Sequence, residues 1–220
     1  MPRGGLNYAE NYMGYKLKIV ELDKLPPAEE FLTERELKTY NDFKVEKRRR
    51  EWLGGRYALK SIAKSIFIFD MKHIEVRSKQ TGQPSLGVPG GCSLPVSITH
   101  SGDFAAAAIG VCGMGIGIDI EAVEPRSPAW AEQSFAKEEI SSWAPVFLTE
   151  LWAKKEAVLK FLGVGLSYDT KDIRFINGRL NFYGKALDLW AKLGSPNVQV
   201  DVKDLDGGYK LAIAWEAPLL

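Results

Sequence analysis

The sequence predicts an α+β protein built from two similar halves. Residues 16–121 run from a strand through helices to further strands, and the chain after residue 121 repeats that order. A length of 220 residues also accommodates two domains, each of about 100 residues. We therefore expect an N-terminal α+β half over residues 1–121 and a C-terminal α+β half over residues 122–220.

The composition is that of an ordinary globular protein, with 45% hydrophobic and 26% charged residues. A formal net charge of +1 gives no overall preference for nucleic acid or membrane. Two cysteines, Cys92 and Cys112, are too few for a disulfide framework and lack the spacing of a zinc site. Because no apolar run is long enough to span a membrane, we expect a soluble cytoplasmic protein with no nucleic-acid or membrane partner.

The first half begins with a strand and two helical regions. Residues 16–21 alternate apolar and polar side chains, as a half-buried strand does. Residues 26–27 are both proline and break the chain. Thr33 is a candidate N-cap, and Glu36, three residues later, completes a capping-box pattern. Residues 45–69 have the periodicity of a long helix.

This long helix is predicted to bury one apolar stripe and to leave the opposite side polar. Arg48, Arg49 and Lys60 lie on the polar side. The stripe is formed by Trp52, Leu59, Ile62, Ile66 and Phe69.

Shorter elements complete the first half. Residues 74–77 are predicted as a strand, and residues 78–95, rich in glycine and proline, as a loop. Three further strands are predicted over residues 95–99, 104–110 and 115–121.

The second half contains one prominent helix followed by strands. Short helical patterns lie around residues 130–143, and a helix is predicted over about residues 149–162, with Gly163 as its terminator. The predicted strands cover residues 172–176, 179–183, 198–202 and 209–215.

Three carboxylates and a lysine stand at spacings that bring them together if a strand packs on a helix. In a strand, Asp119 and Glu121 project from one side, because they are two residues apart. In a helix, Trp152, Glu156 and Lys160 recur every four residues and form one stripe. Converging acids repel each other unless a cation neutralises them, and hard oxygen ligands suit Mg2+. The spacing therefore predicts a magnesium site formed by Asp119, Glu121 and Glu156.

Each part of this pattern also has an ordinary interpretation. The two acids of the strand are compatible with the polar side of an edge strand in water. Glu156 and Lys160 alone are typical of a solvated helix pair. The same helix already offers Lys154 and Lys155 to solvent, so that Glu156 borders Trp152 and not a purely polar face. The combination of strand and helix favours a functional site.

Other motifs are weaker. Gly113, Gly115 and Gly117 precede a strand and do not match the dinucleotide-binding pattern, so we expect them to shape a turn and allow close packing. Residues 135–139 are predicted to pack at the surface. His100 precedes a turn and is compatible with either a phosphate ligand or a turn cap.

Several motifs together resemble the 4'-phosphopantetheinyl transferases of the larger, Sfp type. Residues 117–121 read G-I-D-I-E, and residues 152–160 match W-x-x-K-E-A-x-x-K. Residues 81–84 stand where the family has a G-K-P segment, residues 97–101 resemble its strand ending in S-H-S, and residues 135–139 resemble its F-x-x-x-E segment.

The resemblance implies transfer of the phosphopantetheine arm of coenzyme A to a serine of an apo acyl, polyketide or peptidyl carrier protein, with release of adenosine 3',5'-bisphosphate. Such chemistry serves fatty acid, polyketide or nonribosomal peptide biosynthesis. It implies Mg2+ bound by Asp119, Glu121 and Glu156, with Glu156 also the candidate general base and Lys160 neutralising the pyrophosphate. It further implies a pseudo-twofold arrangement of the halves, an active site at their interface and a monomer.

Residues expected to bind coenzyme A follow from the same resemblance. Gln83 stands where the family usually has lysine, which removes a positive charge and leaves phosphate recognition to Arg48, Arg50, Arg56 or Lys79. We expect one or more of those arginines to compensate. The expected coenzyme A ligands are Arg48, Arg50, Arg56, Gly82, Gln83, Pro84, His100 and Ser101.

A carrier protein usually presents an acidic helix, so its contact surface here should combine apolar and basic groups. Residues 122–135, with Arg126 and Trp130, are the expected surface. A Mg2+-dependent phosphohydrolase acting on a nucleotide or pyrophosphate and a non-catalytic carrier-binding module are the alternatives. The intact acidic residues and Lys160 favour the transferase over the module, since a decayed site should have lost at least one of them.

Overall fold

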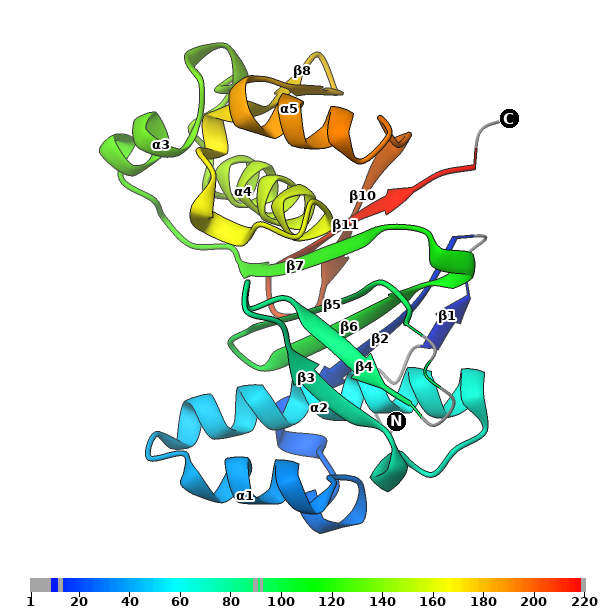
Figure 1. Ribbon diagram of the computed structural model, residues 1–220. Helices are drawn as coiled ribbons and strands as arrows, with labels where there is room; N and C mark the ends of the chain where they lie inside the picture. Colours follow the sequence, from blue (N-terminus) through cyan, green and yellow to red (C-terminus); the bar gives the residue numbers. More distant parts are fainter. Residues whose placement is uncertain (1–8, 12–13, 89–90, 92, 219–220) are drawn as a thin grey trace. The chain divides into compact units, whose positions relative to one another are not determined.

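The chain folds into two compact units, Met1–Met114 and Gly115–Leu220, each with helices and strands (Figure 1). A computed structural model describes residues 9–11, 14–88, 91 and 93–218. The predicted α+β class is confirmed. We predicted a division after residue 121, whereas the strand over residues 116–122 belongs to the second unit because it pairs and packs there. Within the described ranges, no helix is long and apolar enough to cross a membrane.

The first unit contains an antiparallel sheet of four strands in the order β1-β2-β6-β5 and a separate hairpin, β3-β4. Its helices and strands are β1 (Ala9–Asn11), β2 (Tyr15–Glu21), α1 (Glu34–Asp42), α2 (Glu46–Phe67), β3 (Glu75–Ser78), β4 (Pro84–Gly87), β5 (Val96–Ser101) and β6 (Phe104–Gly110).

The predicted loop over residues 78–95 contains β4, which the sequence did not indicate. Four residues pair with β3 across a turn in which Gly82 has φ +83°. A strand this short carries little periodicity, and its glycine and proline content favours a turn. Residues 89–90 and 92 of this predicted loop lie outside the described ranges.

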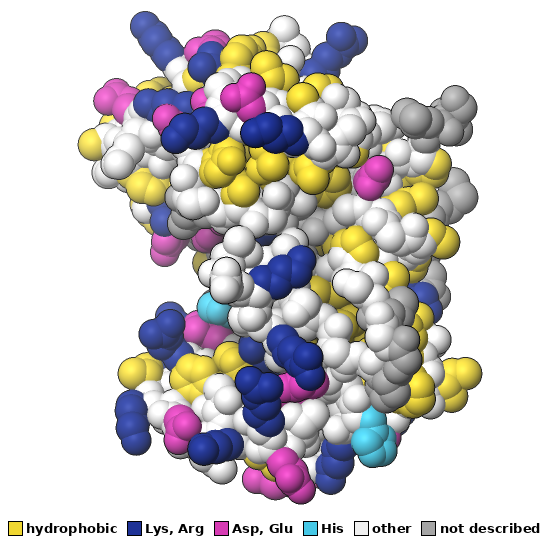
Figure 2. Space-filling model, viewed as in Figure 1, with side chains coloured by type: hydrophobic (Ala, Val, Ile, Leu, Met, Phe, Trp, Pro, Cys, Tyr) yellow, Lys and Arg dark blue, Asp and Glu magenta, His cyan; other side chains and the backbone are white. Residues whose placement is uncertain are grey.

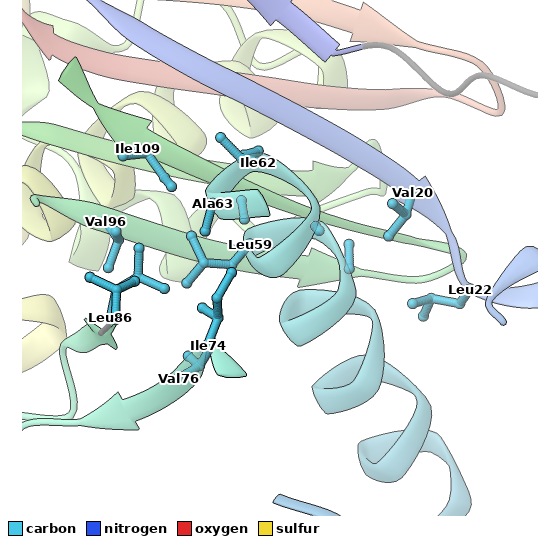
Figure 3. Packing of buried hydrophobic residues seen from close by; sticks show 14 residues of the cluster. Val20, Leu22, Leu59, Ile62, Ala63, Ile74, Val76, Leu86, Val96 and Ile109 are labelled. Atoms are coloured by element: carbon cyan, nitrogen blue, oxygen red, sulfur yellow. The ribbon is translucent and has the colours of Figure 1, made fainter. Parts of the chain in front are cut away.

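The core of the first unit lies between α2, the sheet and the hairpin (Figure 3). Leu59 and Ile62 of α2 are buried, as the predicted stripe requires. They pack in one cluster with strand residues such as Val20 and Ile109 and with Val76 of the hairpin. The capping box at the start of α1 is also confirmed, because Glu36 N–H donates to Thr33 Oγ1 and Thr33 N–H donates to Glu36 Oε2.

The second unit is built on an antiparallel sheet in the order β10-β11-β7, with α4 packed against β7 and β11. Its helices and strands are β7 (Ile116–Ala122), α3 (Pro128–Ser134), α4 (Pro145–Phe161), β8 (Ile173–Ile176), β9 (Arg179–Phe182), α5 (Gly184–Lys192), β10 (Val198–Leu205) and β11 (Tyr209–Glu216). Strands β8 and β9 form a hairpin.

Helix α4 begins four residues earlier than predicted, because Pro145 occupies its first turn, where a missing N–H does no harm. It ends where predicted, since Gly163 adopts φ +75° and its N–H donates to Lys160 O. Helix α5, which the sequence analysis did not predict, buries Ala186 against the second core.

The two units repeat one topology. Each unit contains, in order, a strand, a long helix, a hairpin and two final strands. These elements are β2, α2, β3-β4, β5 and β6 in the first unit and β7, α4, β8-β9, β10 and β11 in the second. The last of these strands, β6 or β11, lies between two neighbours in its sheet. The order predicted for two similar halves is thus present, although the sequence shows no residue-by-residue repeat.

The repeat includes a buried ion pair in each unit. Lys60 of α2 pairs with Glu36 and donates to Phe31 O, while Val76 N–H donates to Glu36 Oε1. Lys60, predicted on the polar side of its helix, is instead fully buried. Burial lowers its pKa, and the Glu36 carboxylate works against that shift.

In the second unit Lys155 of α4 pairs with Glu139 at 2.7 Å and donates to Thr170 O. Phe175 N–H of β8 donates to Glu139 Oε1, as Val76 of β3 does to Glu36. Lys155 was predicted to face solvent, which is wrong, because it is fully buried and joins helix, turn and hairpin inside the unit. Residues 135–139 were predicted to pack at the surface; Lys137 and Glu138 are exposed there, but Phe135 and Glu139 are buried.

Candidate active site

Strand β7 directs its two acids toward α4. Asp119 and Glu121 lie opposite Ala212 and Lys210 of β11 and share one side of the strand with Gly117. A Cβ atom on Gly117 would lie 2.1 Å from Ala157 O and 2.3 Å from Phe161 N, so the strand touches the helix backbone there. The close packing predicted for this glycine is confirmed.

The stripe on α4 meets both acids. Lys160 Nζ lies 2.6 Å from Asp119 Oδ1, and Trp152 Nε1 donates to Glu121 Oε1 at 3.1 Å. Glu156 lies between Trp152 and Lys160 on the helix, close enough to Asp119 and Glu121 for their charges to raise its pKa. The structure therefore brings together the four residues that spacing had singled out.

Glu156 has the most perturbed environment of the four. Its side chain is buried, and Oε1 has no hydrogen-bond partner among the described residues. Burial, together with the negative charge of Asp119, raises the pKa of Glu156 to about 7, although Lys160 opposes the shift. Burial and Asp119 also raise the pKa of Glu121. A carboxyl with a pKa near neutrality is suited to proton transfer.

The donor set suits a hard cation. Burial and the negative charge of Asp119 raise the pKa of both Glu156 and Glu121. Three carboxylates with one buried oxygen, Oε1 of Glu156, left without a partner among the described residues have the chemistry of Mg2+ ligands. Within the residues described, however, no three His, Cys, Asp or Glu side chains already form a group able to hold a metal ion. Lys160 and Trp152 instead contact Asp119 and Glu121.

Glu121 has a second partner, which spacing alone did not reveal. Arg126 Nη2 lies 3.3 Å from Glu121 Oε2, and Arg126 Nη1 lies 3.1 Å from Glu124 Oε1. The guanidinium carbon is 4.8 Å from the centre of the Trp130 ring, which itself lies 5.2 Å from the Trp152 ring. Glu121 is thus held on one oxygen by an indole and on the other by a guanidinium.

The first unit contains a separate pocket of about 310 Å³, a size suited to part of a small-molecule ligand. Lys and Arg side chains stand on the surface of this unit among acidic and apolar side chains (Figure 2). The pocket is lined by Phe43, Arg48, Glu51, Trp52, Gly55, Arg56, Ser78, Gly82, Pro84, Ile98 and His100.

Arg56 is the most constrained cation of this pocket. Its guanidinium carbon lies 3.9 Å from the centre of the Trp52 ring, and its Nε is buried without a partner among the described residues. Burial lowers the pKa of Arg56 to about 10, which leaves it charged at neutral pH. A stacked arginine with free donors is suited to a phosphate group.

Glu51 is a pocket residue that the sequence analysis missed. Its Oε2 lies 3.7 Å from His100 Nδ1, and its Oε1 lies 3.9 Å from Lys47 Nζ. No local pattern indicates this contact, because the histidine comes from the end of β5 and the acid from α2.

The pocket unites only some of the predicted coenzyme A ligands. Arg48, Arg56, Gly82, Pro84 and His100 line it. Within the described part of the chain, three others do not line it: Arg50, Gln83 and Ser101. Gln83 instead accepts a hydrogen bond from Lys79 Nζ at 2.8 Å.

Comparison with known families separates the same two units. Residues 115–214 match the model of the 4'-phosphopantetheinyl transferase superfamily. The chain belongs to this superfamily. Residues 42–110 match the 4'-phosphopantetheinyl transferase N-terminal domain, which agrees with the larger, Sfp type that the motifs resemble. The predicted enzyme class, a phosphopantetheinyl transferase, is confirmed with it.

Individual relatives are distant. The chain is 27% identical over 177 residues to the 4'-phosphopantetheinyl transferase psf-1 of Bacillus pumilus, covering 77% of this chain and 72% of the relative. It is 29% identical over 108 residues to the holo-[acyl-carrier-protein] synthase of Petrotoga mobilis, covering 43% of this chain and 91% of that protein.

Two solved structures resemble part of the transferase chain. The holo-(acyl-carrier-protein) synthase of Bacillus anthracis, in complex with CoA (3',5'-ADP), has 28% identity and a TM-score of 0.39 over 44% of this chain and 93% of its own. The holo-[acyl-carrier-protein] synthase of Neisseria meningitidis has 23% identity and a TM-score of 0.39 over 47% of this chain and 98% of its own.

Proposed function

We propose that this enzyme transfers the 4'-phosphopantetheine arm of coenzyme A to a serine of an apo carrier protein in a Mg2+-dependent reaction, and acts as a monomer. The observation that carries the proposal is Glu156, a buried carboxylate that has an oxygen without a partner among the described residues and, in the metal-free protein, a pKa of about 7. Asp119, Glu121 and Lys160 surround it with the charges that phosphoryl transfer requires.

The reaction balances as a displacement at phosphorus. The serine oxygen bonds to the phosphorus that carries the pantetheine arm, the bond from that phosphorus to the bridging pyrophosphate oxygen breaks, and adenosine 3',5'-bisphosphate leaves. Glu156 accepts the serine proton, directly or through a water molecule. Lys160, now paired with Asp119, neutralises charge on the pyrophosphate. Asp119, Glu121 and Glu156 would hold Mg2+, which would supply further neutralisation of the pyrophosphate charge.

We further propose that the pocket of the first unit binds the phosphorylated nucleoside part of coenzyme A. Arg48 and Arg56 supply the positive charge that Gln83 lacks, and Trp52 keeps the Arg56 guanidinium in place. Glu51 lies beside His100 at the pocket wall. Residues 122–135 are the proposed contact for an acidic carrier helix.

Release of adenosine 3',5'-bisphosphate from coenzyme A, measured with and without an apo acyl carrier protein, tests this function against hydrolysis. Transfer predicts release only when the carrier is present, in equal amount to modified carrier, and no release in a chelator. Equal release without any carrier would identify a phosphohydrolase. Binding of coenzyme A without release in either case would identify a non-catalytic module.

A further inference from the structure

We infer that Arg126 is a built-in competitor of the metal at Glu121, so that Mg2+ binding displaces its guanidinium from the acidic cluster. The inference rests on the proposed function, because it assumes that Glu121 is a metal ligand. Arg126 lies on an irregular segment after β7. It contacts Oε2 of Glu121, whereas Trp152 contacts Oε1. A cation on Oε2 offsets the negative charge by which Glu121 would attract a metal ion.

Arg126 has two contacts, with Glu124 and with the Trp130 ring, that it can keep when its guanidinium moves away from Glu121. Besides Glu121 it contacts Glu124, whose side chain is 57% exposed, and stacks on the Trp130 ring. If it leaves Glu121, it keeps the carboxylate of Glu124 and the ring. Since a partly exposed ion pair contributes little to stability, a divalent ion can replace this contact.

Trp152 has the opposite role. Its indole N–H fixes Glu121 Oε1 without adding charge, and its ring packs on Trp130 and Phe135. It is therefore a positioning residue, because it restricts the Glu121 carboxylate while leaving its negative charge available. Arg126 and Trp152 should change the affinity for Mg2+ in opposite directions.

Isothermal titration of Mg2+ into the full-length protein, without coenzyme A or carrier, tests this inference. We expect Arg126→Gln to lower the Mg2+ dissociation constant about fivefold, as loss of one competing ion pair predicts. Arg126→Lys should stay near the wild-type value because the charge is kept. Trp152→Phe should raise the constant. The matched control is Arg174→Gln, which removes an arginine that likewise pairs with a glutamate, Glu138, and stacks on a ring, that of Tyr183.

Unaltered or weaker Mg2+ binding by Arg126→Gln would overturn the inference, as would no measurable binding by either protein. Failure of the proposed function is distinguished by the carrier assay, which reports transfer of the arm independently of the titration. If the arm is transferred but Arg126→Gln binds Mg2+ with the wild-type affinity, the inference about Arg126 is wrong and the proposed function stands. If the wild-type protein transfers no arm but Arg126→Gln binds Mg2+ more tightly, the proposed function is wrong and the competition between Arg126 and Mg2+ is supported.

Discussion

Lys155 and Glu156 are neighbours on α4, yet their side chains have opposite environments. Lys155 Nζ is fully paired, 2.7 Å from Glu139 and 2.9 Å from Thr170 O. Glu156 Oε1 is buried with no partner among the described residues. The adjacent lysine and glutamate of the family motif thus differ: Lys155 belongs to a buried ion pair, and Glu156 has a buried oxygen without a partner among the described residues.

We predict that substitution of Lys155 mainly lowers stability, whereas substitution of Lys160, the other lysine of the motif, mainly lowers activity. Lys155→Met leaves Glu139 charged and buried without its cation, so the free energy of unfolding should fall by about 3–5 kcal/mol. Lys160→Met removes a partly exposed cation and should lower kcat with a much smaller loss of stability. Urea denaturation and steady-state kinetics of both variants check this. A strongly destabilised Lys160→Met beside a stable Lys155→Met would contradict the assignment.

Gly117 is predicted to be intolerant of any side chain. A methyl group there meets Ala157 O and Phe161 N of the α4 backbone, neither of which is a flexible side-chain end. Gly117→Ala should therefore move β7 away from α4 and lower stability by about 1–3 kcal/mol, as overpacking does. Thermal unfolding measures this. Gly178→Ala is the control for a glycine with open space around it, although its φ of +74° adds some strain. An equal effect of both changes would refute the close-contact explanation.

The raised pKa of Glu156 predicts a pH-dependent penalty on the metal-free fold. Below about pH 4.5 the carboxyl is protonated in folded and unfolded chains alike, and no penalty exists. Between pH 4.5 and about 7 the unfolded chain ionises first, so the free energy of unfolding falls, and above pH 7 the penalty is complete.

Glu156→Gln should consequently stabilise the metal-free protein at pH 8 by roughly 3 kcal/mol, and have almost no effect at pH 4.5. Urea titrations of wild type and variant in a chelator measure the difference. If the variant is less stable than wild type at pH 8, ionised Glu156 does not lower the free energy of unfolding and the prediction is wrong.

The pocket of the first unit makes a prediction about arginines. Arg56→Gln should raise the KM for coenzyme A about tenfold or more, because a charge-assisted hydrogen bond contributes about 1.5–3 kcal/mol. Arg49→Gln is a matched control: Arg49 also stacks on a ring, that of Tyr40, and pairs with Glu46, but it is not among the residues described as lining the pocket. Similar KM values for the two variants would place the nucleotide elsewhere.

Local periodicity was enough to predict the acidic cluster. Asp119 and Glu121 are separated by the strand repeat, and Glu156 and Lys160 by the helix repeat, so one packing contact brings them together. Their convergence in the second unit needs no long-range information beyond that contact. Their roles in binding metal and moving protons stay predictions.

The buried ion pairs could not be predicted in this way. Lys60 and Glu36 are 24 residues apart, and Lys155 and Glu139 are 16 apart. Each lysine stands among polar neighbours on its helix, where solvent exposure is the ordinary expectation. Only the tertiary position of the capping turn, with its carboxylate already bonded to backbone N–H groups, makes burial favourable. The same limit applies to Arg126, whose contact with Glu121 depends on the irregular segment after β7.

Intact-mass spectrometry of an apo acyl carrier protein, incubated with coenzyme A, Mg2+ and enzyme, tests the central claim most directly. Wild type and Glu150→Gln, which alters an acid on the same helix paired with Lys154 and Lys210, should add one phosphopantetheine arm to the carrier. Glu156→Gln, and wild type in a chelator, should add none. Full modification by Glu156→Gln would contradict the role given to this carboxylate, and no modification by wild type with several carrier types would contradict the proposed function.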